Sequence, residues 1–256
     1  MTNTELVYIF GKHAVLEALI HRPEIVKELY IEHGFTDEKI FNRLTKASIV
    51  PKPLNPKRLP GGLRGEAVHQ GIIAGIAVQN LMREYKEFMS TCTATPDTCF
   101  LILGEVQDPH NVGAVIRSAA AFGLAGVMIP PHNQAPVTGT VVKVSAGMAF
   151  RIPLIEIRNV NATIRDLKDR GFWIYGLAGE GAVPVTTEIF TKPTAFILGN
   201  EGSGLREKTR DVCDTLVSIP MHPRCESLNA AASAAVVMYA WSAQHGASLS
   251  TSITQL

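Results

Sequence analysis

The chain has 256 residues, of which 46% are hydrophobic and 18% are charged, and its formal net charge is +1. This length suits one large domain or two smaller ones, and the composition is too apolar for a disordered chain. No apolar run approaches the roughly 20 residues of a membrane span, and the N-terminus lacks a signal-peptide pattern. The near-neutral charge does not indicate a general nucleic-acid-binding protein, for which a strongly basic balance is expected.

The four cysteines show no C-x-x-C spacing and no histidine pattern beside them (Cys92, Cys99, Cys213 and Cys225). Neither a zinc site nor a disulfide framework is therefore indicated. The sequence favours a reduced, cytoplasmic protein that holds no metal and enters no membrane.

Residues 1–79 are predicted to form a small α/β module. Its elements are expected in the order strand 7–10, helix to 20, strand 27–31, helix 37–47, a proline-rich stretch 51–60 and strand 70–78. Residues 80–98 are predicted to be a linker. A short helix at 84–89 fits this region, but 90–98 is polar, threonine-rich and contains a proline.

From residue 100 onward, apolar strands alternate with helices. The expected strands are 100–104, 126–130, 153–157, 172–177, 194–199 and 215–219. The expected helices are about 111–122, 138–147, 160–170, 204–211 and 227–244. Continuous apolar strands alternating with helices are typical of a parallel sheet that is covered on both faces.

Three of these strands run into a polar loop and then a helix. The loops contain Asn111, Glu201 and the pair Ser227 and Asn229, and Arg117 follows in the first helix. Asn111 and Ser227 are predicted to be helix N-caps. Because the carboxyl ends of parallel strands and the free N–H groups of helix starts meet at one edge, we expect a composite site there.

Each loop alone also has an ordinary structural explanation. Arg117 could extend to the surface along its aliphatic stem. The glycine-rich turn 199–204 matches neither G-x-G-x-x-G nor a P-loop. His110, His132 and His222 are isolated histidines in loops, and such residues more often have no catalytic role.

Taken together, the order, spacing and residues of the three segments resemble the signature motifs of the SpoU-type RNA ribose 2′-O-methyltransferases of the SPOUT superfamily. This resemblance covers residues 100–243. Residues 9–15 and 67–74 resemble the start and end of the L30e-like RNA-binding domain of one branch. The resemblance implies a small N-terminal L30e-like α/β domain at 1–79 and a methyltransferase domain at 99–256. The latter would be a Rossmann-like parallel sheet with a C-terminal deep trefoil knot, a topology otherwise very rare.

The resemblance also implies a homodimer that transfers a methyl group from S-adenosylmethionine to a ribose 2′-OH in RNA, with a guanosine of 23S rRNA as the expected target. By motif matching, Arg117 engages the 2′-OH or its adjacent phosphate. Asn111 and Glu201 orient the site, and Ser227 and Asn229 position the phosphate and the arginine. The expected cofactor-binding residues are Leu198, Gly199, Gly202, Ile219, Pro220, Met221 and Leu228.

The N-terminal domain is expected to bind structured RNA. Its candidate RNA-binding residues are Lys12, His13, Lys52, Lys57, Arg58 and Arg64. Five positions depart from the usual motif residues (Ala120, Met148, Phe150, Pro223 and Ala231), whereas the five expected catalytic residues match.

Two alternatives stay open: the same chemistry on tRNA or another rRNA site, and a non-catalytic RNA-binding ribosome-assembly factor. A nucleotide-dependent dehydrogenase is disfavoured because the first strand–helix turn lacks the G-x-G-x-x-G pattern.

Overall fold

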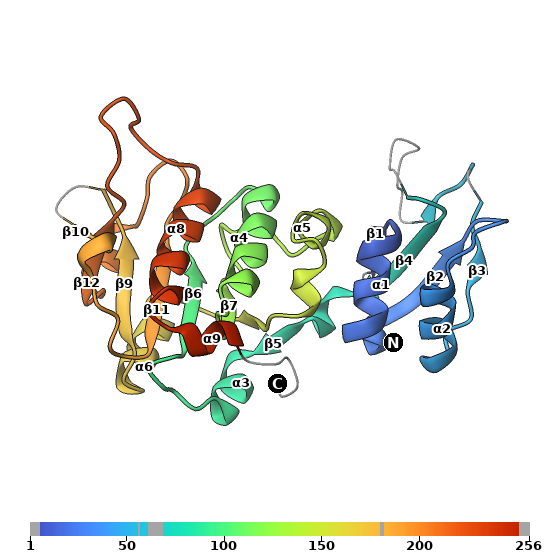
Figure 1. Ribbon diagram of the computed structural model, residues 1–256, viewed down its shortest axis with the longest axis horizontal. Helices are drawn as coiled ribbons and strands as arrows, with labels where there is room; N and C mark the ends of the chain where they lie inside the picture. The colour runs from blue at the N-terminus through green and yellow to red at the C-terminus, as the bar shows by residue number, and fades with distance from the viewer. Residues whose placement is uncertain (1–5, 56, 61–68, 180–181, 251–256) are drawn as a thin grey trace. The chain divides into compact units, whose positions relative to one another are not determined.

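The computed structural model describes residues 6–55, 57–60, 69–179 and 182–250 (Figure 1). The chain forms two compact units, one of residues 1–82 with 137–151 and the other of residues 83–136 with 152–256. We describe each unit by itself.

The first unit contains a four-stranded sheet flanked by helices. The strand order is β1 (Leu6–Phe10), β4 (Ile72–Ala77), β2 (Val26–Ile31) and β3 (Lys52–Pro53). Strand β4 pairs antiparallel with both β1 and β2, and β3 lies parallel to β2. The helices are α1 (Lys12–His21) and α2 (Glu38–Lys46). The strands and helices predicted here are confirmed, whereas the two-residue β3 was not predicted.

Residues 137–151 belong to this first unit, although the sequence placed them inside a continuous 99–256 domain. They form α5 (Gly139–Val144) and a short 3-10 turn. The backbone at Gly139 lies so close to β1 that an added Cβ would stand 2.6 Å from the carbonyl oxygen of Tyr8. Val141 and Val142 are fully buried, so this segment needs an apolar partner surface, and the first unit supplies it.

The second unit is built on an eight-stranded sheet with the order β10-β12-β9-β11-β6-β7-β8-β5. All pairings from β10 to β8 are parallel. The strands are β5 (Met82–Glu84), β6 (Cys99–Leu103), β7 (Gly126–Ile129), β8 (Leu154–Glu156), β9 (Trp173–Leu177), β10 (Val183–Pro184), β11 (Thr194–Leu198) and β12 (Thr215–Ser218).

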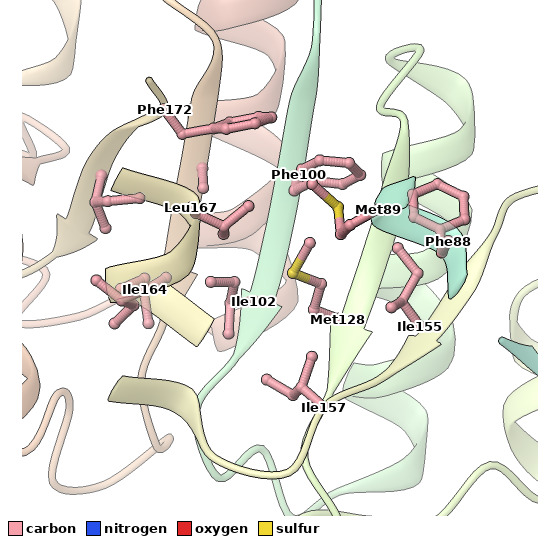
Figure 2. Packing of buried hydrophobic residues seen from close by; sticks show 13 residues of the cluster. Phe88, Met89, Phe100, Ile102, Met128, Ile155, Ile157, Ile164, Leu167 and Phe172 are labelled. Carbon is pink, nitrogen blue, oxygen red and sulfur yellow. The ribbon is translucent and has the colours of Figure 1, made fainter. Parts of the chain in front are cut away.

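Helices cover both faces of this sheet, as predicted. Figure 2 shows the packing on one face, where Phe100 and Met128 of the central strands contact side chains of α3 (Tyr85–Thr91) and α6 (Val160–Asp169). On the other face, α4 (Pro109–Ala121) packs against α8 (Ala230–Ser242), whose Trp241 is fully buried (Figure 1). The short helices α7 (Glu207–Arg210) and α9 (Gly246–Ser250) complete the unit.

Residues 80–98, predicted to be a linker, are largely structured. They contain β5 and α3, and the apolar side chains of Phe88 and Met89 enter the core because they line one face of α3. Across the described ranges, no helix is long and apolar enough to cross a membrane. Within the same ranges, no cluster of three or more histidine, cysteine or acidic side chains could hold a metal ion.

Candidate functional site

The three polar loops meet at the carboxyl edge of the parallel sheet. The loop after β6 leads into α4, the loop 199–204 follows β11, and the loop 219–229 connects β12 with α8. Strands β6 and β11 are direct neighbours, and the backbone N–H of Gly104 donates a 2.6 Å hydrogen bond to the carbonyl of Leu198. The three loops therefore lie together at this edge, as predicted.

A chain of side-chain hydrogen bonds joins all three loops. Asn229 Nδ2 donates to Asn111 Oδ1 at 2.8 Å, and Asn111 Nδ2 donates to Glu201 Oε1 at 3.2 Å. Asn111 is only 8% exposed, so its amide is held in one orientation by partners on both sides. Residues from three separate parts of the sequence are thus joined into one hydrogen-bonded unit.

The Glu201 carboxylate accepts two further hydrogen bonds, from the backbone N–H groups of Gln107 at 3.3 Å and Asp108 at 3.4 Å. Burial by itself would raise the pKa of this carboxyl. The hydrogen bonds from its own backbone, from Asn111 and from the 107–108 backbone outweigh burial and lower the pKa below its usual value. Glu201 is therefore an anion at neutral pH.

Two helix starts differ from the sequence prediction. The N-cap of α4 is Asp108, whose Oδ1 accepts from the N–H of His110 at 2.8 Å, and Pro109 occupies the first helical position. The N-cap of α8 is Asn229, whose Oδ1 accepts from the N–H of Ala231 at 2.8 Å. The predicted caps Asn111 and Ser227 were wrong, because a competent capping side chain stands at the actual boundary of each helix.

Arg117 and Ser227 are exposed and stand apart from this hydrogen-bonded chain. Arg117 lies six residues after Asn111 on α4, which places it about 120° around the helix axis. Over the described part of the chain, its guanidinium has no hydrogen bond or ion pair. Both side chains are thus available to a ligand.

A cavity of about 480 Å³ opens beside the chain of hydrogen bonds. It is lined by the ends of β9, β11 and β12 and by the loop that leads to α8. Among the predicted cofactor-binding residues, the lining includes Leu198, Gly199, Ile219, Met221 and Leu228 but not Gly202 or Pro220. Gly202 instead donates its N–H to Asn200 Oδ1 at 2.9 Å within the loop.

Other lining residues were not anticipated from the sequence. They include the end of β9 at Leu177–Gly179 and Ser233, the fourth residue of α8. The end of β9 could have been predicted from the sequence, since a buried strand followed by Ala-Gly resembles the two other strand ends. Ser233 carried no such signal, because it lies within an alanine-rich helix.

Comparisons with known proteins identify the family of the chain. The model of the SpoU rRNA Methylase family matches residues 98–239. The chain belongs to the SpoU rRNA methylase family. A second model, described as RNA 2′-O ribose methyltransferase substrate binding, matches residues 8–81.

Similar proteins match almost the whole length of this SpoU-family chain. The 23S rRNA (guanosine-2′-O-)-methyltransferase RlmB of Vibrio vulnificus is 35% identical over 235 residues, which are 91% of this chain and 94% of that protein. The protein of the same name from Xanthomonas campestris is 37% identical over 235 residues, with the same two shares. The crystal structure of the SpoU methyltransferase AviRb from Streptomyces viridochromogenes with AdoMet superimposes with a TM-score of 0.78, at 23% identity, over 94% of this chain and 90% of that one.

These matches confirm the predicted enzyme class, an S-adenosylmethionine-dependent RNA ribose 2′-O-methyltransferase with an α/β fold and a parallel sheet. The cavity suits that cofactor. Its volume is within the range of small-molecule sites, and Met221 and Leu228 expose 42% and 37% of their surface beside it. Such apolar side chains can cover a flat base, while the anionic Glu201 lies at the same wall and can attract a positively charged group.

The candidate RNA-binding residues of the first unit differ in whether their side chains already have a charged partner. Lys12 lies 3.8 Å from the Asp37 carboxylate, and Lys52 lies 2.9 Å from Glu28, so both charges are already paired. The others are His13, Lys57 and Arg58, which are exposed, and Arg64, which lies outside the described residues.

Proposed function

We propose that this SpoU-family methyltransferase methylates the ribose 2′-OH of a guanosine in 23S rRNA. The observation that carries the proposal is the Asn229–Asn111–Glu201 chain, which joins all three motif loops beside a cofactor-sized cavity. The RlmB relatives are named for this reaction, and each is matched over more than nine-tenths of its length.

The cofactor-binding residues are those that line the cavity at the ends of β11 and β12. Backbone groups of Leu198, Gly199 and Ile219 would hold S-adenosylmethionine, with Met221 and Leu228 against its apolar parts. When bound, the cofactor would supply an activated methyl group on a positively charged sulfur, which leaves as a neutral thioether. The ribose 2′-oxygen gains the methyl group and loses its proton to solvent. Glu201 contributes a fixed negative charge at the same wall.

The protein's own side chains act on the RNA by positioning it and by their charge. The Arg117 guanidinium carries hydrogen-bond donors and no acceptor, so it holds the target ribose or its phosphate and stabilises the oxygen as negative charge develops on it. Ser227 offers a free hydroxyl to the same phosphate. The chain from Asn229 to Glu201 keeps the loops in register, and correct placement of the 2′-oxygen in line with the methyl group supplies much of the rate.

The active form in this proposal is a homodimer with a C-terminal knot. Support for the dimer comes from apolar side chains exposed on α8 and α9, where Val236, Tyr239 and Leu249 expose 38%, 61% and 57% of their surface. Support for the knot comes from the strand order, because the chain passes from β11 beyond β9 to β12 and then returns as α8 to pack on α4.

Residues 1–79 are proposed to be the L30e-like domain that docks the RNA. The match of residues 8–81 to a substrate-binding family supports this role. His13, Lys57 and Arg58 are the available charged or titratable contacts, whereas Lys12 and Lys52 must first release their carboxylate partners.

The test is transfer of labelled methyl from S-adenosylmethionine to size-separated RNA from a strain that lacks the protein. Label in 23S rRNA as 2′-O-methylguanosine is expected. Label only in tRNA or another rRNA would support ribose methylation but contradict 23S rRNA as the substrate. No label in any RNA or assembling ribosomal particle, with the cofactor still bound, would favour the non-catalytic assembly factor.

Arg117→Ala tests the assigned residue. Transfer is expected to fall at least a hundredfold, while the Kd for S-adenosylmethionine changes less than threefold. Arg165→Ala removes another exposed arginine, on α6, and is the matched control. Equal loss of cofactor binding and transfer in Arg117→Ala would contradict the role given to Arg117.

A further inference from the structure

A second cavity, of about 230 Å³, lies at the carboxyl ends of β6, β7 and β8 and at the start of α6. It is separated from the cofactor cavity by the loop 199–204, and Gly204 lines both. The catalytic motifs leave this cavity without a role.

Glu105 lines this cavity and is held in place through both its backbone and its side chain. Its φ of 71° lies in the left-handed region, which is costly for a residue with a side chain. Its carboxylate is paired with Arg206, whose Nε donates to Oε2 at 3.1 Å, and it accepts from Asn133 Nδ2 at 3.3 Å. Its carbonyl accepts a 2.9 Å hydrogen bond from Asn200, the residue before Glu201. The strained backbone therefore holds the Glu105–Arg206 pair next to the methyl-transfer site.

The other walls combine flat apolar groups with a free cation. Pro130, Pro131 and Leu205 supply apolar surface. Arg158 is exposed and, among the residues that the structure places, has no hydrogen-bond or ion-pair partner. Unstacked bases bind proteins by stacking on apolar rings or guanidinium planes and by hydrogen bonds at their edges.

We propose that this cavity binds the guanine base of the nucleotide whose ribose is methylated, with Glu105 and Arg206 reading its edge. The inference rests on the proposed function, since it assigns the base of the same target guanosine. A carboxylate can accept from both N1–H and N2–H of guanine, and a guanidinium can donate to O6 or N7. Adenine has an acceptor at N1, which would face the carboxylate unpaired. The Glu105–Arg206 pair therefore matches guanine and not adenine.

The decisive test combines a protein variant with a change in the base. Short 23S rRNA fragments that carry guanosine or inosine at the methylated position differ only in the N2 amino group. With the wild-type protein, inosine is expected to lower kcat/KM roughly tenfold. For Glu105→Gln, kcat/KM with the guanosine fragment is expected to fall by a similar factor. The difference in kcat/KM between guanosine and inosine is then expected to disappear. A merely structural role of Glu105 would lower both rates and keep their ratio, which would overturn the proposal.

Controls separate this result from unfolding and from failure of the proposed function. Glu105→Gln should keep the Kd for S-adenosylmethionine within twofold, and Arg165→Ala should keep the guanosine-to-inosine ratio. If the wild-type protein methylates 23S rRNA without discriminating the two bases, the cavity assignment fails and the proposed function stands.

A binding measurement does not depend on methyl transfer at all. The wild-type protein is expected to bind GMP more tightly than AMP in a titration, and Glu105→Gln is expected to lose that preference. Equal binding of GMP, AMP and inorganic phosphate would identify an anion site and overturn the guanine assignment. A GMP preference that depends on Glu105 would support the cavity assignment even if 23S rRNA proved not to be the substrate.

Discussion

Asn229 makes two interactions that different substitutions can separate. Its Oδ1 caps α8 by accepting from Ala231 at 2.8 Å and Ala232 at 3.3 Å, and its Nδ2 donates to Asn111 at 2.8 Å. Serine is as good an N-cap as asparagine, but its side chain is too short to reach Asn111. Asn229→Ser therefore breaks the chain of hydrogen bonds and keeps the cap, whereas Asn229→Ala loses both.

The two variants should differ in stability by the value of the cap. Loss of the hydrogen bond to the buried Asn111 costs about 1 kcal/mol, and loss of the cap costs about 1 kcal/mol more. For a chain of this size, each kcal/mol lowers Tm by roughly 2–4 °C. We expect decreases of roughly 2–4 °C for Asn229→Ser and roughly 4–8 °C for Asn229→Ala, measured by calorimetry.

Methyl transfer should fall equally in both variants, by roughly a hundredfold, because both release Asn111 and with it the orientation of Glu201. Single-turnover transfer to 23S rRNA, with the Kd for S-adenosylmethionine measured alongside, checks this. Wild-type activity in Asn229→Ser would refute the idea that the chain of hydrogen bonds organises the site. Equal Tm values for the two variants would refute the capping role.

Three further changes test the loop 199–204, the Glu201 carboxylate and the core. Gly199→Ala would place a Cβ 2.4 Å from a backbone atom across the loop, so we expect the Kd for S-adenosylmethionine to rise at least tenfold in titration calorimetry. The control is Gly202→Ala, where the nearest atom to the added Cβ is at 3.6 Å and the Kd should change less than twofold. Ionised Glu201 stabilises the fold above about pH 4.5 and loses this effect as pH falls through its lowered pKa, so Tm should fall less steeply from pH 5 to 3 in Glu201→Gln than in the wild type. Phe100→Ala should cost about 3–5 kcal/mol in a denaturant titration, since this fully buried ring contacts two other aromatic rings; a loss under about 1 kcal/mol would contradict that packing.

The sequence was most informative where a segment's own pattern determines its structure. The long apolar strands and the helices between them were placed within a few residues, because burial of both sheet faces leaves continuous apolar runs. The strands β3, β5 and β10 were missed because two or three residues carry no periodicity. The helix caps were misplaced because several polar residues compete within each loop and only the final geometry selects one.

Long-range contacts set the remaining limits. Nothing in residues 137–151 alone reveals that they pack on β1, since a buried helix face looks the same whichever surface covers it. The pairing of Lys12 with Asp37 and of Lys52 with Glu28 was equally hidden, because the partners are 25 and 24 residues apart in the chain. The Asn229–Asn111 contact spans 118 residues and was not predicted, although the combination of motifs did predict that their loops meet.

The position of the active site follows from the topology of the sheet. Strands β6, β7 and β8 are added in one direction, and the chain then returns to place β11, β9 and β12 on the other side of β6. Ligands of open α/β sheets bind near such a reversal, and the cofactor cavity lies beside it, at the ends of β9, β11 and β12. An added Cβ at Gly104 would stand 2.8 Å from the Leu198 carbonyl, so the two strands can separate into their loops only beyond this point. The cofactor cavity and the proposed guanine cavity meet at Gly204, the one residue among their described lining residues that both share.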